Sequence, residues 1–313
     1  MKHTVLMGDP SYFSVVGGAN PHTRDRWGRR KRANREIAIK QWHELRSRLE
    51  DLGLRVVVVP PHPAWPGLVY PANAGARFGD DFVLSHLTPT RSGETPLYRS
   101  AIEPLGLRCH TLEARFEGEA DLFPAGDRYL FTYGEIQRQR FVPRCGIPPW
   151  RRIYGFRSDL RALEEVDCIH PFDREVLRVR LVDERYYHGD TCLCSFGPGR
   201  SALLAYEAAL DPDDVRNLRE TFGARLILIT DEDAALYAAN SFAFEHAGRH
   251  FLIMPNGISS ALQARIERLD VCVIKVDVSE FLKKGGGSVK CMIGDLGRLP
   301  DVSDVDRHRP ERG

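Results

Sequence analysis

A cysteine follows three adjacent glycines near the end of the chain, in residues 285–292 (GGGSVKCM). Adjacent glycines let the backbone adopt conformations that are closed to other residues, and they let a ligand approach it closely. The thiolate is the nucleophilic form of cysteine, and the neighbouring Lys290 is expected to favour it. Free cysteines are usually core residues, so Cys291 taken alone fits a buried thiol and a nucleophile equally well.

Two further segments carry side chains that could act on the same substrate as a thiolate. Residues 186–192 (YYHGDTC) place His188 and Asp190 two positions apart, which on a strand would put both side chains on one face. Residues 116–123 (FEGEADLF) place Glu117, Glu119 and Asp121 at alternate positions. On a strand these acids would also share a face, which is either a solvated surface or an anionic pocket for a cation.

A thiolate, a histidine and several carboxylates together suit attack on a cationic planar carbon. Carboxylates hold a guanidinium through charge-assisted hydrogen bonds. Cys291 would attack the central carbon, and His188 would protonate the departing amine. The residue types therefore indicate a guanidinium as the electrophile.

These side chains must be positioned by an α/β fold, because short strand-like apolar runs alternate with helical stretches. The predicted strands, several of them rich in β-branched residues, cover residues 56–60, 82–85, 129–132, 202–205, 226–229, 251–254 and 271–276. The predicted helices cover residues 35–52, 212–222, 231–245 and 259–268, with Ser259 as the N-cap of the last. Because no polar linker divides this pattern, we predict one domain over residues 1–298 and a charged, expendable tail over residues 299–313.

Composition narrows the class of ligand. The 44 basic residues nearly balance the 43 acidic ones, so there is no global field that favours nucleic acid or a membrane, and a small soluble ligand is expected. The basic run at residues 24–35 is expected to be a solvated loop. Seven cysteines at irregular spacings suit reduced thiols in the cytoplasm. Cys192 and Cys194 lack the partners of a zinc site, and the chain lacks nucleotide-binding motifs, so neither a metal nor a cofactor is expected.

The three motifs resemble, in order, those of the guanidino-group-modifying (pentein) superfamily, which includes dimethylarginine dimethylaminohydrolases, arginine deiminases and amidinotransferases. The resemblance covers about residues 1–298. It implies a single-domain, fivefold pseudo-symmetric α/β propeller of ββαβ modules around a central polar site. By the same resemblance Cys291 is the nucleophile that forms an amidino-thioether, His188 is the general acid that later activates water, and Asp190 binds the guanidinium. The acidic motif has one extra residue, so Glu117 and Asp121 are the expected site residues and Glu119 is held in reserve.

Further substrate contacts are implied by the positions of other segments. Residues 155–158 (GFRS) resemble a segment whose arginine holds an α-carboxylate, so Arg157 is either that residue or an ordinary surface cation. Asn73 stands where deiminases carry an acid, which weakens the case for free arginine. Gly189 replaces a usual leucine and is expected to change the fit of the pocket. Asn20 belongs to residues 17–22 (GGANPH), where the N-terminal loop of the family approaches the site.

The expected function is hydrolysis of the guanidino group of arginine or an N-substituted arginine, which gives a ureido product plus ammonia or an amine. The same residues would serve an amidinotransferase, in which an amine takes the amidino group from Cys291. A third interpretation is a propeller that binds a partner without chemistry. The expected partner is a small guanidino compound, and a homodimer is compatible with the sequence, which leaves the oligomeric state open.

Overall fold

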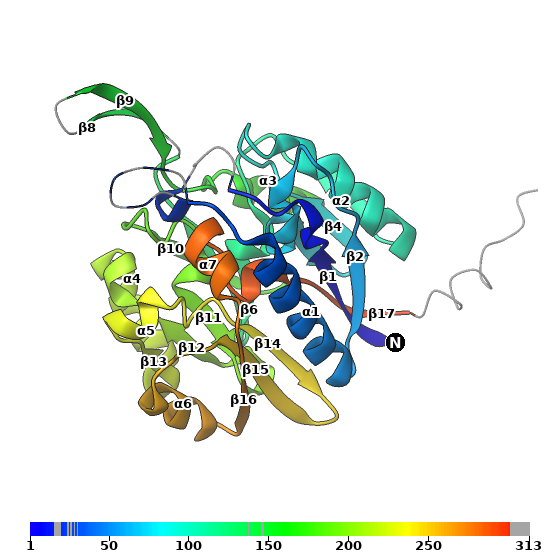
Figure 1. Ribbon diagram of the computed structural model, residues 1–313. Coiled ribbons are helices and arrows are strands. Elements are labelled where there is room, and N and C mark those ends of the chain that lie inside the picture. The colour runs from blue at the N-terminus through cyan, green and yellow to red at the C-terminus, as the bar shows by residue number, and fades with distance from the viewer. Residues whose placement is uncertain are drawn as a thin grey trace, which may run out of the picture.

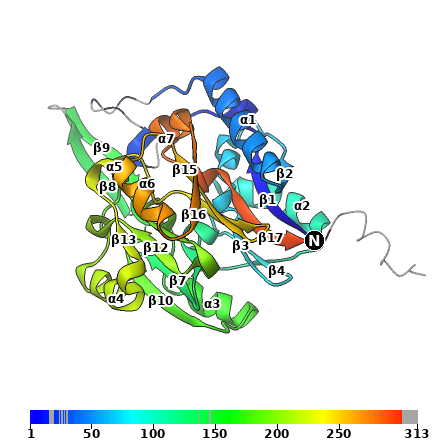
Figure 2. The same ribbon diagram turned by 90° about the horizontal axis from the view of Figure 1, so that it is seen from below.

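The computed structural model describes residues 1–15, 20–23, 25, 27, 29, 31–136, 138–144 and 147–300. Within them, five three-stranded sheets surround the centre of the molecule, and a two-stranded ribbon projects from one side (Figure 1). That ribbon consists of β8 (Arg138–Arg144) and β9 (Ile147–Tyr154). The helices α1 (Arg35–Asp51), α2 (Thr95–Ile102), α3 (Ala162–Ile169) and α4 (Pro212–Phe222) lie at the periphery (Figure 2).

The five sheets share one connectivity. In each sheet the first strand is antiparallel to the middle strand, the middle strand is parallel to the third, and a helix connects these last two. Four sheets follow the chain in order: β3 (Gly75–Phe78), β4 (Asp81–Leu84) and β5 (Arg108–Thr111); β6 (Leu122–Ala125), β7 (Arg128–Tyr133) and β10 (Glu175–Arg180); β11 (Leu193–Phe196), β12 (Ala202–Ala205) and β13 (Leu226–Leu228); β14 (Phe242–His246), β15 (Arg249–Pro255) and β16 (Val271–Val276).

The fifth sheet joins the two ends of this arrangement. β17 (Gly294–Leu299) is antiparallel to β1 (Lys2–Gly8), and β1 is parallel to β2 (Arg55–Val59). The helix α1 makes the connection between β1 and β2. The predicted fivefold propeller of ββαβ modules is therefore confirmed.

Most predicted elements agree with the structure to within a few residues, and one does not. The predicted helices at residues 35–52, 212–222 and 259–268 correspond to α1, α4 and α6 (Ser260–Glu267), and Ser259 caps α6 by accepting from the backbone N–H of Leu262 at 3.1 Å. The helix predicted over residues 231–245 is wrong. The helix α5 ends at Ala235, and residues 242–246 form β14, because Phe242 and Phe244 alternate with smaller or charged residues as a strand requires.

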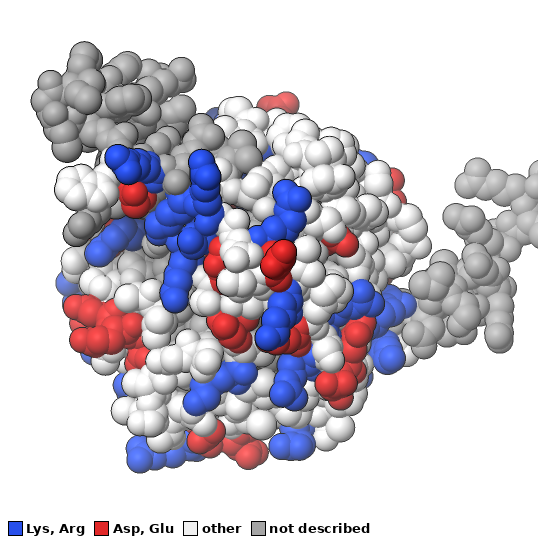
Figure 3. Space-filling view, in the orientation of Figure 1, with Lys and Arg blue, Asp and Glu red and all other residues white. Residues whose placement is uncertain are grey.

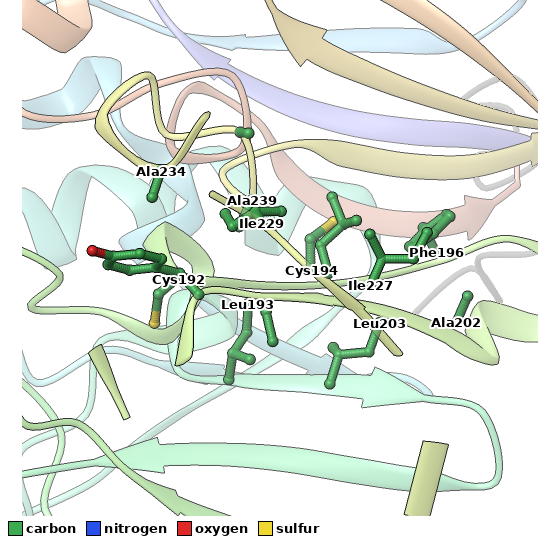
Figure 4. Packing of buried hydrophobic residues seen from close by; sticks show 14 of the residues in the cluster. Cys192, Leu193, Cys194, Phe196, Ala202, Leu203, Ile227, Ile229, Ala234 and Ala239 are labelled. Atoms are coloured by element: carbon green, nitrogen blue, oxygen red, sulfur yellow. The ribbon is translucent and has the colours of Figure 1, made fainter. Parts of the chain in front are cut away.

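The apolar core lies within and between the modules. Figure 4 shows part of it, where β11, β12 and β13 pack against α5 (Asp231–Ala235) and the segment that follows it. Cys192 and Cys194 are buried in this cluster, and burial raises the pKa of Cys192 far above its ordinary value and that of Cys194 to about 12. These two thiols are therefore packing residues.

Both basic and acidic side chains are present on the face shown in Figure 3. No helix in the described part of the chain combines the length and apolar character that a membrane span requires. Residues 301–313 of the predicted tail, and Gly17, Gly18 and Ala19 of the predicted N-terminal loop, lie outside the described residues. The domain boundary at residue 298 stays a prediction.

Candidate functional site

Short 3-10 turns bring the chemically important side chains together. Four modules begin with such a turn, whose first residue lies four positions before the first strand: η4 (Pro71–Asn73) before β3, η7 (Gly118–Ala120) before β6, η8 (Gly189–Thr191) before β11 and η12 (Lys290–Met292) before β17. Neighbouring turns contact one another, η12 with η4, η4 with η7 and η7 with η8. The three sequence motifs therefore meet at the centre of the propeller.

A cavity of about 370 Å³ opens at this centre. Four predicted site residues line it, namely Cys291, His188, Asn73 and Asn20. The rest of the wall is largely apolar or aromatic and includes Phe13, Trp65, Tyr70 and Tyr187. A cavity of this size and lining, with a few convergent polar groups, suits a small molecule that carries charge at defined points.

Cys291 is the middle residue of η12 and is only 4% exposed. Its Sγ lies 3.6 Å from Oδ2 and 4.0 Å from Oδ1 of Asp190. Burial raises the pKa of this thiol well above its ordinary value, and the Asp190 carboxylate raises it further. A cation bound against Asp190 would oppose both effects, so substrate binding itself would favour the thiolate.

Lys290, which was expected to favour the thiolate of Cys291, is paired with other groups. Its Nζ lies 2.8 Å from Oε1 of Glu119 and donates to the carbonyl oxygen of Ile293 at 3.0 Å. Glu119 also accepts from the backbone N–H of Asp295, and burial raises its pKa to about 7. Glu119 is thus held by an ion pair behind the Cys291 turn and is not among the described residues that line the cavity.

His188 and Glu117 form a buried pair at the cavity wall. His188 Nε2 lies 2.8 Å from Glu117 Oε2, and the two side chains are 3% and 2% exposed. Burial disfavours the charged forms of both groups. The attraction between the imidazolium and the Glu117 carboxylate, and that between the imidazolium and Asp121, outweigh this effect. The pKa of His188 is therefore raised above 6.5, and the pKa of Glu117 is lowered to about 2. The Glu117 carboxylate therefore keeps the His188 imidazole protonated, and the imidazole can then donate this proton to a substrate.

Asp121 lies behind the His188 turn and supports it. Its Oδ1 accepts from the Gly189 backbone N–H at 2.9 Å and from the Thr132 hydroxyl at 2.6 Å, and its Oδ2 accepts from the Ser158 hydroxyl at 2.6 Å. Glu117, Glu119 and Asp121 therefore have three different sets of partners. The expectation that they share one face is wrong, because η7 replaces the strand on which the alternation would have held.

Replacing Asp121 with alanine should destabilise the protein. The change leaves buried donors from Gly189, Thr132 and Ser158 unsatisfied, so we expect the free energy of unfolding to fall by about 3 kcal/mol. Urea denaturation followed by circular dichroism measures this. Asp213→Ala, whose carboxylate lies on the exposed side of α4, is the control and should change stability by less than about 0.5 kcal/mol. Equal losses in the two variants would contradict the supporting role of Asp121.

Asp190 is held in η8, a turn rather than the predicted strand, with Gly189 beside it. Burial raises the pKa of Asp190 to about 6, so its carboxylate titrates within reach of neutral pH. A Cβ on Gly189 would lie 2.3 Å from Oγ1 of Thr132. Close packing against β7 therefore requires glycine at position 189. The expected change in the fit of the pocket stays a prediction.

Arg91 is the site residue that sequence analysis missed. It lines the cavity, and its Nη1 donates to Asn73 Oδ1 at 2.9 Å while Nη2 donates to Glu94 Oε2 at 2.7 Å. Glu94 is 1% exposed, so the ion pair is anchored on its acidic side. The three-residue spacing to Glu94 is the only local signal that could have drawn attention to Arg91.

Asn20 and Arg157 approach the site from outside the turns. Asn20 Nδ2 donates to the carbonyl oxygen of Gly285 at 3.1 Å and to the Tyr187 hydroxyl at 3.3 Å, which ties the N-terminal loop to the glycine turn. Arg157 is 5% exposed, with its guanidinium carbon 4.9 Å from the centre of the Tyr187 ring. It is therefore not a surface cation. Its contact with substrate stays a prediction.

Comparison with known proteins points to one kind of chemistry. A family model described as N,N dimethylarginine dimethylhydrolase, eukaryotic, matches residues 154–298. A bifunctional arginine dihydrolase/ornithine cyclodeaminase from Nostoc sp. is 33% identical over 92% of this chain and 37% of its own length. The N(G),N(G)-dimethylarginine dimethylaminohydrolase of Mycobacterium tuberculosis is 29% identical over 91% of this chain and 83% of its own.

A solved structure extends this similarity to the whole fold. The N-terminal domain of the cyanobacterial arginine dihydrolase ArgZ, bound to product, is 28% identical and superposes with a TM-score of 0.80 over 96% of this chain and 100% of that domain. The chain spans less than two fifths of the length of the bifunctional relatives from Nostoc and Synechocystis. In ArgZ the matching part is the N-terminal domain.

Proposed function

Because the chain belongs to the guanidino-group-modifying superfamily, we propose that it is a cysteine-dependent hydrolase of the guanidino group of arginine or an N-substituted arginine. One observation carries this proposal. Cys291 and His188 line one cavity, Glu117 lies 2.8 Å from His188, and the Asp190 carboxylate lies 3.6 Å from the sulfur. A nucleophile, an acid and an anion thus surround the place where a guanidinium carbon would sit.

The reaction follows from these positions. Asp190 binds the guanidinium, whose positive charge then lies near the sulfur of Cys291, so the thiol loses its proton to solvent. The thiolate of Cys291 attacks the central carbon, and the C–N bond to one terminal nitrogen breaks as His188 protonates that nitrogen. The product of this half-reaction is an amidino-thioether and free ammonia or amine. His188, now neutral, accepts a proton from water as the water attacks the same carbon, and loss of the sulfur leaves a ureido group.

Arg91 supports an amino-acid substrate in this proposal. Its guanidinium lies on the cavity wall and is paired at 2.7 Å with the buried carboxylate of Glu94, which also lines the cavity. A cation there can attract the α-carboxylate of arginine while the guanidino end reaches Asp190.

Asn73 favours a second candidate, complete conversion of arginine and two waters to ornithine, carbon dioxide and two ammonia. Arg91 can only donate, so its bond to Oδ1 fixes the orientation of the amide. The amide Nδ2 is buried at the cavity and has no hydrogen-bond partner within the described chain. A guanidinium offers it only donors, whereas a ureido oxygen is an acceptor. Asn73 therefore suits retention of the ureido product for a second hydrolysis.

The amount of ammonia released per arginine consumed separates the two candidates. Purified protein is incubated with arginine, monomethylarginine and dimethylarginine, with and without glycine as an acceptor, and the products are identified by mass spectrometry. Citrulline with one ammonia supports single hydrolysis, and ornithine with two supports the second candidate. In the latter case Asn73→Asp, which keeps the acceptor for Arg91 and removes the donor, should lower the ratio from about two towards one. Product that forms only with glycine, or no product from any substrate, would overturn the hydrolytic proposal.

A further inference from the structure

None of the three sequence motifs lies directly before the first strand of one further module. It is the sheet of β14, β15 and β16, whose first strand begins within the stretch predicted as a helix. Asn240 lies two residues before β14, the same place that Asn73 holds before β3. Its side chain is fully buried at 0% exposure. A fully buried amide at the centre of the propeller must find partners for its donors and its acceptor.

Asn240 bonds to both turns that carry the Cys291–Asp190 contact. Its Oδ1 accepts from the backbone N–H groups of Ser288 at 3.0 Å and Cys291 at 3.2 Å. Its Nδ2 donates to the backbone carbonyl oxygen of Asp190 at 3.0 Å. The backbone N–H of Lys290 donates to the carbonyl oxygen of Asn240 at 3.1 Å. One residue thus binds three positions of the nucleophile's segment and the backbone of its anionic neighbour.

The orientation of this amide is determined by its partners. Two backbone N–H groups can only donate, so they require the oxygen, and a backbone carbonyl can only accept, so it requires the nitrogen. An aspartate could keep the first two bonds but not the third, and an alanine could keep none. Asparagine is therefore the residue type that satisfies all three side-chain contacts at once.

We propose that Asn240 is a positioning residue that fixes the sulfur of Cys291 against Asp190 through the backbones of η12 and η8. The proposal rests on the proposed function, in which Cys291 is the nucleophile and Asp190 holds the cation. Asn240 is not among the described residues that line the cavity, so it acts through Cys291 and Asp190 and not on the substrate. Displacement of a reacting group by about 1 Å can lower a rate by about 10²-fold.

The test compares Asn240→Ala and Asn240→Asp with wild type in steady-state kinetics and in Cys291 alkylation by iodoacetamide, read peptide by peptide in a mass spectrometer. Asn240→Ala should lower kcat by about 10²-fold with KM changed by less than about threefold, because the cavity wall is intact. Asn240→Asp places a carboxylate beside the Cys291 turn, which disfavours the thiolate. The pH midpoint for alkylation of Cys291 should therefore move upward in this variant.

Asn34→Ala is the matched control. The Asn34 side chain also accepts two backbone N–H groups, from Glu36 and Ile37 at 3.1 and 3.2 Å, but it caps α1 away from the cavity. Its loss should lower stability without changing kcat or the alkylation midpoint. Wild-type kcat in Asn240→Ala, an unmoved midpoint in Asn240→Asp, or failure of both variants to fold would overturn the positioning role. Alkylation needs no turnover, so a wild type without hydrolase activity would refute the proposed function and still leave Asn240 testable.

Discussion

Cys291→Ser should abolish turnover, with kcat reduced by at least about 10⁴-fold, because loss of an enzyme's nucleophile removes the covalent route altogether. A serine hydroxyl at the same place would lack a thiolate's nucleophilicity, and His188 is already engaged by Glu117 at 2.8 Å. The side chain is small and buried, so the exchange should leave the fold intact. Discontinuous assays of ureido product measure the rate, and thermal unfolding checks the fold.

Cys272→Ser serves as the control for this loss, because Cys272 is a half-buried cysteine of β16. It should retain wild-type activity. A haloacetamidine directed at guanidino sites should label Cys291 in wild type, while Cys192, buried in the apolar core, should stay unmodified. Labelling of another cysteine would overturn the assignment of Cys291 as the nucleophile. Absence of turnover in wild type, together with full partner binding by Cys291→Ser, would favour the interpretation of a non-catalytic binding protein.

The second large effect concerns His188 and its pH dependence. His188→Ala should lower kcat by about 10³-fold, within the range that general acid–base catalysis contributes. The protonated imidazole is required to release the amine. It persists at pH values below the pKa of His188 and is lost as the pH rises through it. Since that pKa lies above 6.5, the basic limb of the rate profile should fall above this value.

Glu117→Gln separates the imidazole from its partner. The variant keeps His188 but removes a carboxylate that holds the proton on it, so the basic limb should move to lower pH. Profiles of kcat/KM against pH measure this shift. The apparent pKa of the basic limb describes the coupled titration of Cys291 and His188 rather than that of one group. Glu165→Gln removes a carboxylate that binds the backbone N–H groups of Glu113 and Ala114 instead, and its profile should match wild type. An unchanged limb in Glu117→Gln, or an unaffected rate in His188→Ala, would refute this assignment.

The chemistry of the site was predictable because it resides in short motifs. Residue types and spacing pointed to Cys291, His188, Glu117 and Asp190. In the structure Cys291 and His188 line one cavity, Glu117 contacts His188 and Asp190 contacts Cys291. The alternate spacing of the acids gave the wrong geometry. A period of two indicates a shared face only on a strand, and here the residues lie in 3-10 turns. Glu119 consequently forms an ion pair with Lys290 and does not line the cavity.

Other parts of the site depend on distant contacts that a sequence pattern does not express. Arg91 sits in a loop without a motif, and only the fold brings it to Asn73. Asn240 was hidden by the helix predicted over residues 231–245, where alanines and acids outweighed the alternating Phe242 and Phe244. Likewise, the order of the five sheets came from the family resemblance, because local periodicity does not determine which strands pair.

The pairing of β1 with β17 has a consequence for the timing of assembly. Leu6 pairs with Gly294 and Lys2 with Leu299, so β17, which follows β1 at a long distance in the sequence, completes the sheet to which β1 belongs. Cys291 lies three residues before β17, within the turn that this pairing anchors. Contacts of such long sequence separation form late and slowly in folding. We therefore expect a chain with His188 and Glu117 already in place to lack a positioned nucleophile until β17 pairs with β1.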